Sequence, residues 1–331
     1  LSGALSVTTA NAVDNSIAII TGMSAATVNV AAGAASDTVT INATALLNDQ
    51  VLSITSGALA AGSVNITGLT GNLNIANPLS GTIGVTVADN TVDDGIAITA
   101  GTTNLLVSGV ADGDTVTVTG FTGANFTGSI AGTSGKFLIT AGLATSTITT
   151  AGGDDTITFA AGTGLTSVDT VNAGAGMDTI ILTGNTAIAA SNFNNVSNIE
   201  TIVLGNTSTA VSITTLDTLV ASGATLTLSN AANTGILTFV GSAETNGSFV
   251  ITGGLGNDLI TAGAGNDSFN GGAGNDTFTF VAGTGLKSAD SVDGGTGTAT
   301  VKLPGNFDVL ASNAFDNVLK IEHITLANTN T

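Results

Sequence analysis

Residues 253–279 read GGLGNDLIT AGAGNDSFN GGAGNDTFT, three tandem copies of one nine-residue unit. Each copy starts with a glycine-rich stretch, continues with an aspartate and ends in a short segment with one large apolar residue: Ile260, Phe269 or Phe278. One inward apolar residue per unit is too little to form a core alone, so successive units must stack to bury it. The period therefore predicts a β-solenoid with glycine turns and very short strands.

The same phase extends outward in both directions. The unit before the triplet, residues 244–252, has Phe249 where the aspartate would stand. Other units keep the glycines and the aspartate less completely: residues 132–140, 141–149, 150–158, 164–172, 173–181, 285–293 and 294–302. The five-residue insertions 159–163 and 280–284 break the phase, which leaves open the partners of Asp267 and Asp290.

Longer duplications organise the rest of the chain. The segment that begins at Leu1 is similar to the one that begins at Leu79, and the segment from Gly153 is similar to the one from Gly274. With much Thr, Val, Ile, Gly and Asn, we expect an all-β protein, a parallel β-solenoid array of duplicated units. The expected units are residues 1–78, 79–131, 132–243 and 244–331. The chain starts and stops within its repeat pattern, so we expect it to be part of a longer protein.

The composition excludes several classes of function. Four Lys and Arg stand against 23 Asp and Glu in 331 residues, which gives a formal net charge of −19. So few cations cannot neutralise a row of phosphates, so we expect no nucleic-acid partner and no attraction to an anionic membrane. No apolar run reaches the ~18 residues of a membrane helix. Cysteine is absent and His323 is the single histidine, so the usual catalytic groups are missing and we predict no enzyme.

The aspartates indicate a metal instead. Glycine turns bring backbone carbonyls close together beside a regular carboxylate, and an oxygen-only set suits Ca²⁺ better than Mg²⁺. If one solenoid turn contains two units, unit n lies next to unit n+2. Asp258 and Asp276 then share one side, with Asp267 on the other. Carboxylates brought so close repel unless a cation lies between them, so folding should depend on the metal.

The pattern G-G-x-G-x-D-x-apolar-x resembles the RTX (haemolysin-type) calcium-binding repeats. The resemblance implies a parallel β-roll with Ca²⁺ lodged between turns, and it indicates the following candidate metal ligands: Asp155, Asp169, Asp178, Gly254, Gly256, Asp258, Gly263, Gly265, Asp267, Gly272, Gly274, Asp276 and Asp290. Turns with Phe137, Ser146 or Phe249 in place of the aspartate are expected to bind no ion. Ala299 stands where the first copy has Asp178, so one ligand should be lost there.

The closing segments 196–206 and 318–328 resemble bacterial surface-layer proteins that carry RTX repeats. This resemblance implies a secreted structural building block at the cell surface, with calcium, copies of itself and cell-surface polysaccharide as partners. Two alternatives stay open: a stalk segment of a large RTX adhesin, and the C-terminal RTX module of a type I-secreted enzyme. Glu200 and Glu322 recur at equivalent positions, where they could cap an edge, pair with Lys320 or bind a cation.

Overall fold

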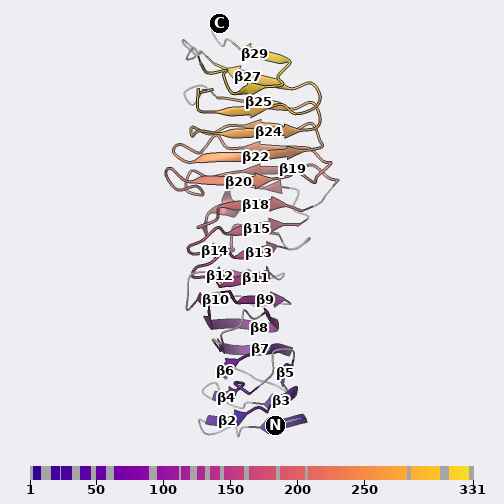
Figure 1. Ribbon diagram of the computed structural model, residues 1–331, viewed down its shortest axis with the longest axis vertical. Helices are drawn as coiled ribbons and strands as arrows, with labels where there is room; N and C mark the ends of the chain where they lie inside the picture. Colours follow the sequence, from indigo (N-terminus) through magenta and orange to yellow (C-terminus); the bar gives the residue numbers. More distant parts are fainter. Residues whose placement is uncertain are drawn as a thin grey trace. The chain divides into compact units, whose positions relative to one another are not determined.

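The computed structural model describes residues 3–8, 16–22, 24–31, 38–45, 50–56, 63–88, 95–111, 113–119, 125–130, 135–141, 145–159, 164–183, 187–205, 208–281, 285–305 and 313–327. The chain forms two compact units. Unit 1 consists of Leu1–Thr163 with Asp169–Asp178, and unit 2 of Gly164–Val168 with Thr179–Thr331. Both units are all-parallel β-solenoids, as the sequence predicts, with strands of successive turns stacked on one another (Figure 1).

The strands of unit 1 form two faces. One face runs β2–β4–β6, through the second halves of β7 and β8, to β10–β12–β14. The other runs β1–β3–β5, through the first halves of β7 and β8, to β9–β11–β13. The bounds are β1 (Gly3–Thr8), β2 (Ser16–Ile20), β3 (Ala26–Ala31), β4 (Thr38–Asn42), β5 (Val51–Ser56), β6 (Ser63–Leu69), β7 (Asn72–Val87), β8 (Gly95–Val110), β9 (Thr115–Thr119), β10 (Asn125–Ile130), β11 (Lys136–Ala141), β12 (Thr147–Thr149), β13 (Thr156–Phe159) and β14 (Thr170–Asn172).

Unit 2 also has two faces. One is β15–β18–β20–β22–β24–β26–β28 and the other is β16–β19–β21–β23–β25–β27–β29. The bounds are β15 (Thr179–Leu182), β16 (Ala187–Ile188), the 3₁₀ turn η1 (Ala190–Phe193), β17 (Val196–Ser197), β18 (Thr201–Leu204), β19 (Val211–Thr214), β20 (Thr225–Ser229), β21 (Leu237–Val240), β22 (Ser248–Gly254), β23 (Leu259–Thr261), β24 (Ser268–Gly272), β25 (Thr277–Thr279), β26 (Ser291–Asp293), β27 (Thr300–Pro304), β28 (Val318–Leu319) and β29 (His323–Ala327).

The core of each unit is a stack of single apolar residues. Because side chains alternate along a strand, the middle residue of each short strand points inward while its neighbours face outward. The positions predicted to point inward are all buried: Ile157, Val171, Ile180, Ile260, Phe269, Phe278 and Val292. Phe239, Ile260 and Phe278 follow one another in register on one face of unit 2, and Phe269 stacks on Phe278 from the other with ring centroids 6.2 Å apart.

Stacking brings unit n next to unit n+2, as predicted. Strand β23 pairs with β25, so Leu259 lies beside Thr277, two nonapeptides further on. The inserted residues 280–284 fall between β25 and β26, and β24 still pairs with β26 in register at Phe269 and Val292. The insertion therefore lengthens a turn without disturbing the strands, although residues 282–284 themselves lie outside the described part of the chain.

The division into four repeat units remains a prediction, and its boundary at residues 78/79 falls within β7. The expectation that the chain does not bind an anionic membrane also remains a prediction. Within the described residues, no helix has the length and apolar character needed to cross a membrane.

Candidate metal centre

A ladder of buried aspartates runs along the turns of unit 2. In each case one carboxylate oxygen accepts the backbone N–H of the residue at the equivalent position in the preceding turn. Asp258 Oδ1 accepts from Leu237 at 2.7 Å, and Asp276 Oδ1 accepts from Asp258 at 2.8 Å. We call these two aspartates the Asp258 column. Both are at most 1% exposed, so the carboxylates lie inside the turns and not on the surface.

A second ladder lies in the turns between the other pair of strand ends. Asp267 Oδ1 accepts from Phe249 N–H at 2.9 Å, and Asp290 Oδ1 accepts from Asp267 N–H at 2.9 Å. We call Asp267 and Asp290 the Asp267 column. Their sequence separation is 23 residues, five more than that of Asp258 and Asp276. Asp267 and Asp290 are therefore partners in neighbouring turns, although the five inserted residues lie between them in the sequence.

The two columns differ at the second carboxylate oxygen. Asp267 Oδ2 accepts the Gly263 N–H at 3.1 Å, and Asp290 Oδ2 accepts the Lys287 N–H at 2.7 Å. By contrast, no hydrogen-bond donor among the described residues reaches Oδ2 of Asp258 or of Asp276. A buried carboxylate oxygen without a hydrogen-bond partner destabilises the folded state, because it has lost its hydrogen bonds to water and forms none within the protein. The Asp258 column therefore needs a positive partner that the described residues do not supply.

Glycines make room around these unpartnered oxygens. A Cβ atom on Gly253 would lie 2.2 Å from Asp258 Oδ2 and 2.4 Å from the Gly271 carbonyl oxygen. A Cβ atom on Gly271 would lie 2.1 Å from Asp276 Oδ2 and 2.9 Å from the Gly294 carbonyl oxygen. A side chain at either glycine would fill this space. Each unpartnered carboxylate oxygen therefore lies near a backbone carbonyl, in the kind of all-oxygen surroundings that hard cations prefer.

The glycines expected to bind metal lie in the same turns. The carbonyls of Gly254 and Gly272 accept N–H groups from Ala273 and Thr296, both at 2.8 Å. A Cβ on Gly274 would lie 2.0 Å from the Gly256 carbonyl oxygen, so these turns are stacked closely. The structure thus brings Gly254, Gly256, Gly272 and Gly274 to the Asp258 column, and Gly263 and Gly265 to the Asp267 column.

Unit 1 carries a shorter form of the ladder. Asp155 Oδ1 accepts from Phe137 N–H at 2.7 Å, and Asp178 Oδ1 accepts from Asp155 N–H at 2.8 Å. Asp169 Oδ1 accepts from Ser146 N–H at 2.7 Å. Asp155 Oδ2 is buried like that of Asp258, but the Thr150 side chain is a hydrogen-bond donor to the Asp155 carboxyl and lowers its pKa, against the stronger effect of burial. Phe137, Ser146 and Phe249 thus have a shared role: each begins a ladder by donating its N–H to the first aspartate.

Burial shifts the acidity of these groups. It raises the pKa of Asp258 from 3.8 to about 7; the Asp276 carboxylate adds to the rise, and the Leu237 N–H opposes it. Burial likewise raises the pKa of Asp155 and of Asp267 to about 6. The pKa values of Asp276 and Asp290 move in the same direction for the same reason. The charged form of each carboxyl is therefore disfavoured in the folded protein when no cation is present.

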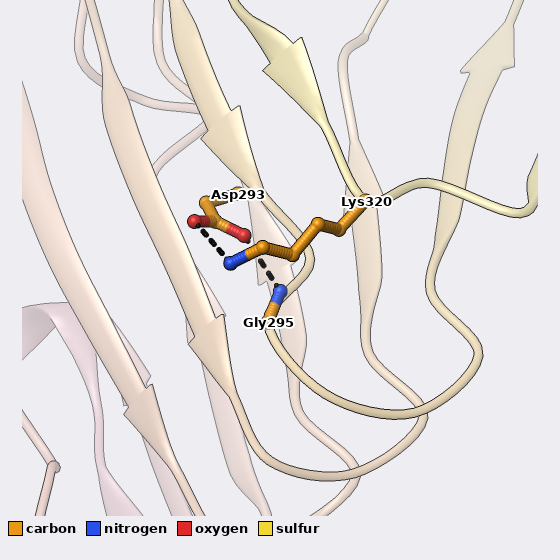
Figure 2. Close-up of polar contacts among 3 residues, drawn as sticks. All are labelled: Asp293, Gly295 and Lys320. Carbon is orange, nitrogen blue, oxygen red and sulfur yellow. Dashed lines mark hydrogen bonds and ion pairs between the residues drawn. The ribbon is translucent and has the colours of Figure 1, made fainter.

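The C-terminal end of the Asp258 ladder is completed differently. Ala299, which lacks a carboxylate, donates its N–H to Glu322 Oε2 at 2.7 Å, so the glutamate takes the position of a ladder aspartate. Lys320 does not pair with Glu322. Its Nζ lies 2.9 Å from Asp293 Oδ2, while Asp293 Oδ1 accepts the Gly295 N–H at 2.9 Å (Figure 2). This ion pair is partly exposed, and such pairs contribute about 0–1 kcal/mol.

Sequence reasoning missed a further buried carboxylate, Glu244. Its Oε1 accepts the N–H groups of Asn246 and Gly247 at 3.0 and 2.7 Å, and Oε2 has no hydrogen-bond partner among the described residues. Glu244 opens the unit in which Phe249 replaces the aspartate, so a carboxylate returns at the first position of the unit where it is missing at the sixth. That compensation within one nonapeptide is the signal that could have identified it.

The residues present fit a calcium ion. Among the described residues, no three His, Cys, Asp or Glu side chains gather closely enough to hold a metal. Ligation would therefore combine one or two carboxylates with backbone carbonyls, which matches Ca²⁺ better than ions that require histidine or thiolate. The unpartnered buried oxygens of Asp258 and Asp276, and the glycine space beside them, are the observations that support this fit.

Comparison with known proteins identifies the repeats. Residues 250–278 match the family described as "RTX calcium-binding nonapeptide repeat (4 copies)". The matched segment contains Asp267 as well as both aspartates of the Asp258 column, and repeats of this family bind calcium, so Ca²⁺ is the cofactor expected from the sequence. No curated protein and no solved structure matches the chain.

Proposed function

We propose that this chain is a structural, calcium-stabilised β-solenoid of a secreted protein, and that calcium binds in the turns of the Asp258 column and at Asp155. The carrying observation is the buried second oxygen of Asp258 and of Asp276, which no described donor reaches. A bound Ca²⁺ supplies the positive charge that these oxygens lack. The sequence predicts thirteen calcium ligands in all, and the others, which include Asp169, Asp178, Asp267 and Asp290, remain candidates.

The chain's own residues prepare the turns for the ion. Asp258 Oδ1 and Asp276 Oδ1 are held by backbone N–H groups, which fixes each carboxylate and directs its other oxygen away from that donor. The glycines at 253 and 271 leave open the space that a side chain would occupy. Because the carboxylates repel one another and are buried, the metal-free turns are destabilised, and calcium binding and folding are coupled.

At the level of the cell, the proposal is a building block of a bacterial surface layer. The support is the Cys-free, strongly acidic solenoid of net charge −19, together with the resemblance of the closing segments to surface-layer proteins. Copies with this charge repel one another, so divalent cations would also favour lateral assembly. Calcium, further copies of the chain and a cell-surface polysaccharide are the proposed partners, and secretion to the cell surface is the proposed location.

Two other proposals share the calcium chemistry. The solenoid could be a stalk segment of a large adhesin or the C-terminal module of a type I-secreted enzyme. Neither needs lateral assembly. Electron microscopy of the chain in millimolar Ca²⁺ separates them: two-dimensional sheets support the surface layer, whereas isolated rods favour the stalk or the module.

The calcium part is tested by titration of the chelated chain with Ca²⁺, followed by far-ultraviolet circular dichroism and light scattering. The turns of unit 2 should order with a midpoint around ~10⁻⁴–10⁻³ M, as in extracellular calcium modules. A spectrum that is the same in excess chelator and in saturating Ca²⁺ would overturn the proposal.

A further inference from the structure

A lysine side chain reaches into the turn that carries Asp267. Lys287 Nζ donates a hydrogen bond to the Ala264 carbonyl and lies 3.5 Å from the Gly265 carbonyl oxygen. These two carbonyls belong to the glycine-rich part of the nonapeptide 262–270. The ammonium group is therefore placed at backbone oxygens of the kind that the calcium proposal requires in the neighbouring column.

The carboxylates around Lys287 are already satisfied. The Lys287 backbone N–H donates to Asp290 Oδ2, and Gly263 N–H donates to Asp267 Oδ2. The positive charge of Lys287 also lowers the pKa of both Asp267 and Asp290, against the stronger effect of their burial. In the Asp267 column every carboxylate oxygen has a hydrogen-bond donor, and a lysine cation lies nearby. In the Asp258 column, Oδ2 of each aspartate has neither a described donor nor a described cation.

The duplicated copy indicates that the aspartate and the lysine belong together. Ser146 stands in the first copy where the second has Asp267, and Thr166 stands where the second has Lys287; Asp169 and Asp290 are equivalent. The first copy thus has one carboxylate and no lysine in this column, and the second has two carboxylates and one lysine. The formal charge of these three positions is the same in both copies, because the additional negative charge is accompanied by an additional positive one.

We propose that the ammonium group of Lys287 is a built-in cation that takes the place of a calcium ion in the turn of Asp267. This inference rests on the proposed calcium sites and adds a distinction to them: two successive nonapeptides with nearly the same sequence differ in whether they need metal. The turn 262–267 is then ordered at calcium concentrations too low to fill the Asp258 column.

The test counts calcium ions on the full chain and on four variants by equilibrium dialysis with atomic emission. Lys287→Thr, the residue of the first copy, should bind one more Ca²⁺ than wild type, because two carboxylates lose their cation. Lys287→Arg keeps the charge and should bind the same number as wild type. Asp267→Asn should lose no ion. An unchanged count in Lys287→Thr, or a lost ion in Asp267→Asn, overturns the inference.

Asp276→Asn separates this inference from the calcium proposal itself. This variant should bind fewer calcium ions than wild type. If it binds the same number, the proposed sites in the Asp258 column are wrong, independently of the results for the Lys287 variants. Hydrogen exchange of the wild type in chelator gives a second reading that does not depend on how the Lys287→Thr variant folds. Residues 262–267 should be at least tenfold better protected than 271–276, and equal protection of the two turns contradicts the role of Lys287.

Discussion

Asp276→Asn should stabilise the protein in chelator and destabilise it in calcium. The substitution keeps Oδ1, which accepts the Asp258 N–H, and replaces the unpartnered buried Oδ2 with a neutral amide. Without calcium, the wild type holds a disfavoured buried carboxylate, whose pKa is raised by burial. Removing its charge also removes the repulsion that raises the pKa of Asp258. The metal-free variant should therefore be more stable than the metal-free wild type.

In calcium the sign reverses. The site loses one of the two carboxylates of the Asp258 column, and affinity in such sites follows the charge of the ligands. If the lost charge contributes ~1.4 kcal/mol to binding, the midpoint of the calcium titration moves to an about tenfold higher concentration. Asp258→Asn should give a similar shift. The double variant should shift the midpoint by less than the sum of the single shifts, because both changes act on neighbouring groups.

The assay is thermal unfolding followed by far-ultraviolet circular dichroism, in chelator and at several calcium concentrations. The chain has no Trp or Tyr, so intrinsic fluorescence offers no sensitive alternative. Asp316→Asn is the matched control, since it removes one carboxylate from an exposed turn. It should change neither the unfolding temperature in chelator nor the calcium midpoint by a measurable amount.

Two results would refute this reasoning. If Asp276→Asn lowers the unfolding temperature in chelator as well as in calcium, the carboxylate stabilises the metal-free fold, and its second oxygen is not the source of strain that we infer. If Asp316→Asn shifts the calcium midpoint as much as Asp276→Asn, calcium acts on the net charge of −19 and not at a specific site.

Three further predictions follow from the same geometry. The chelated protein should be more stable at pH 5 than at pH 8, because the folded pKa values of about 7 for Asp258 and about 6 for Asp155 lie above the ordinary value of 3.8 and stability falls as pH rises through this range. A higher unfolding temperature at pH 8 than at pH 5 would contradict this prediction. Mg²⁺ should order the turns poorly at concentrations where Ca²⁺ saturates them, since it dehydrates reluctantly and demands a tight octahedron; equal circular dichroism spectra in the two ions would indicate simple screening. Hydrogen exchange in chelator should leave residues 63–88 and 95–111 protected, because their β-ladders and buried apolar residues contain no nonapeptide; their loss together with 253–279 would reveal calcium dependence outside the repeats.

The nonapeptide period was sufficient to predict the stacking. Because one apolar residue per unit must face inward, a nine-residue repeat predicts a solenoid, and two units per turn was the condition on which the prediction of neighbouring aspartates rested. The prediction that Asp258 and Asp276 are neighbours, with Asp267 in the other column, is confirmed by the strand register and by the Asp258–Asp276 hydrogen bond. The same local argument identified the buried strand residues and an oxygen-rich turn suited to calcium.

The partners across the insertion and at the end of the ladder could not be predicted in this way. Asp267 and Asp290 are neighbours because the backbone ladder of β24 and β26 fixes their register, and a longer turn costs little free energy. Glu322 replaces a ladder aspartate only because its segment returns beside Ala299. Neither contact has a local sequence signal, since each joins residues that are brought together by stacking alone.

The sequence by itself determined the solenoid, its period and the kind of ion, because these depend on spacing and on the chemistry of residue types. Only the tertiary structure decided which carboxylate oxygens are satisfied. Asp258 and Asp267 stand in nearly identical nonapeptides, yet Asp267 Oδ2 accepts an N–H while Asp258 Oδ2 has no described partner. The donor, Gly263, lies in the same nonapeptide as Asp267, so the difference arises from the conformation of each glycine turn, which is set by packing in three dimensions.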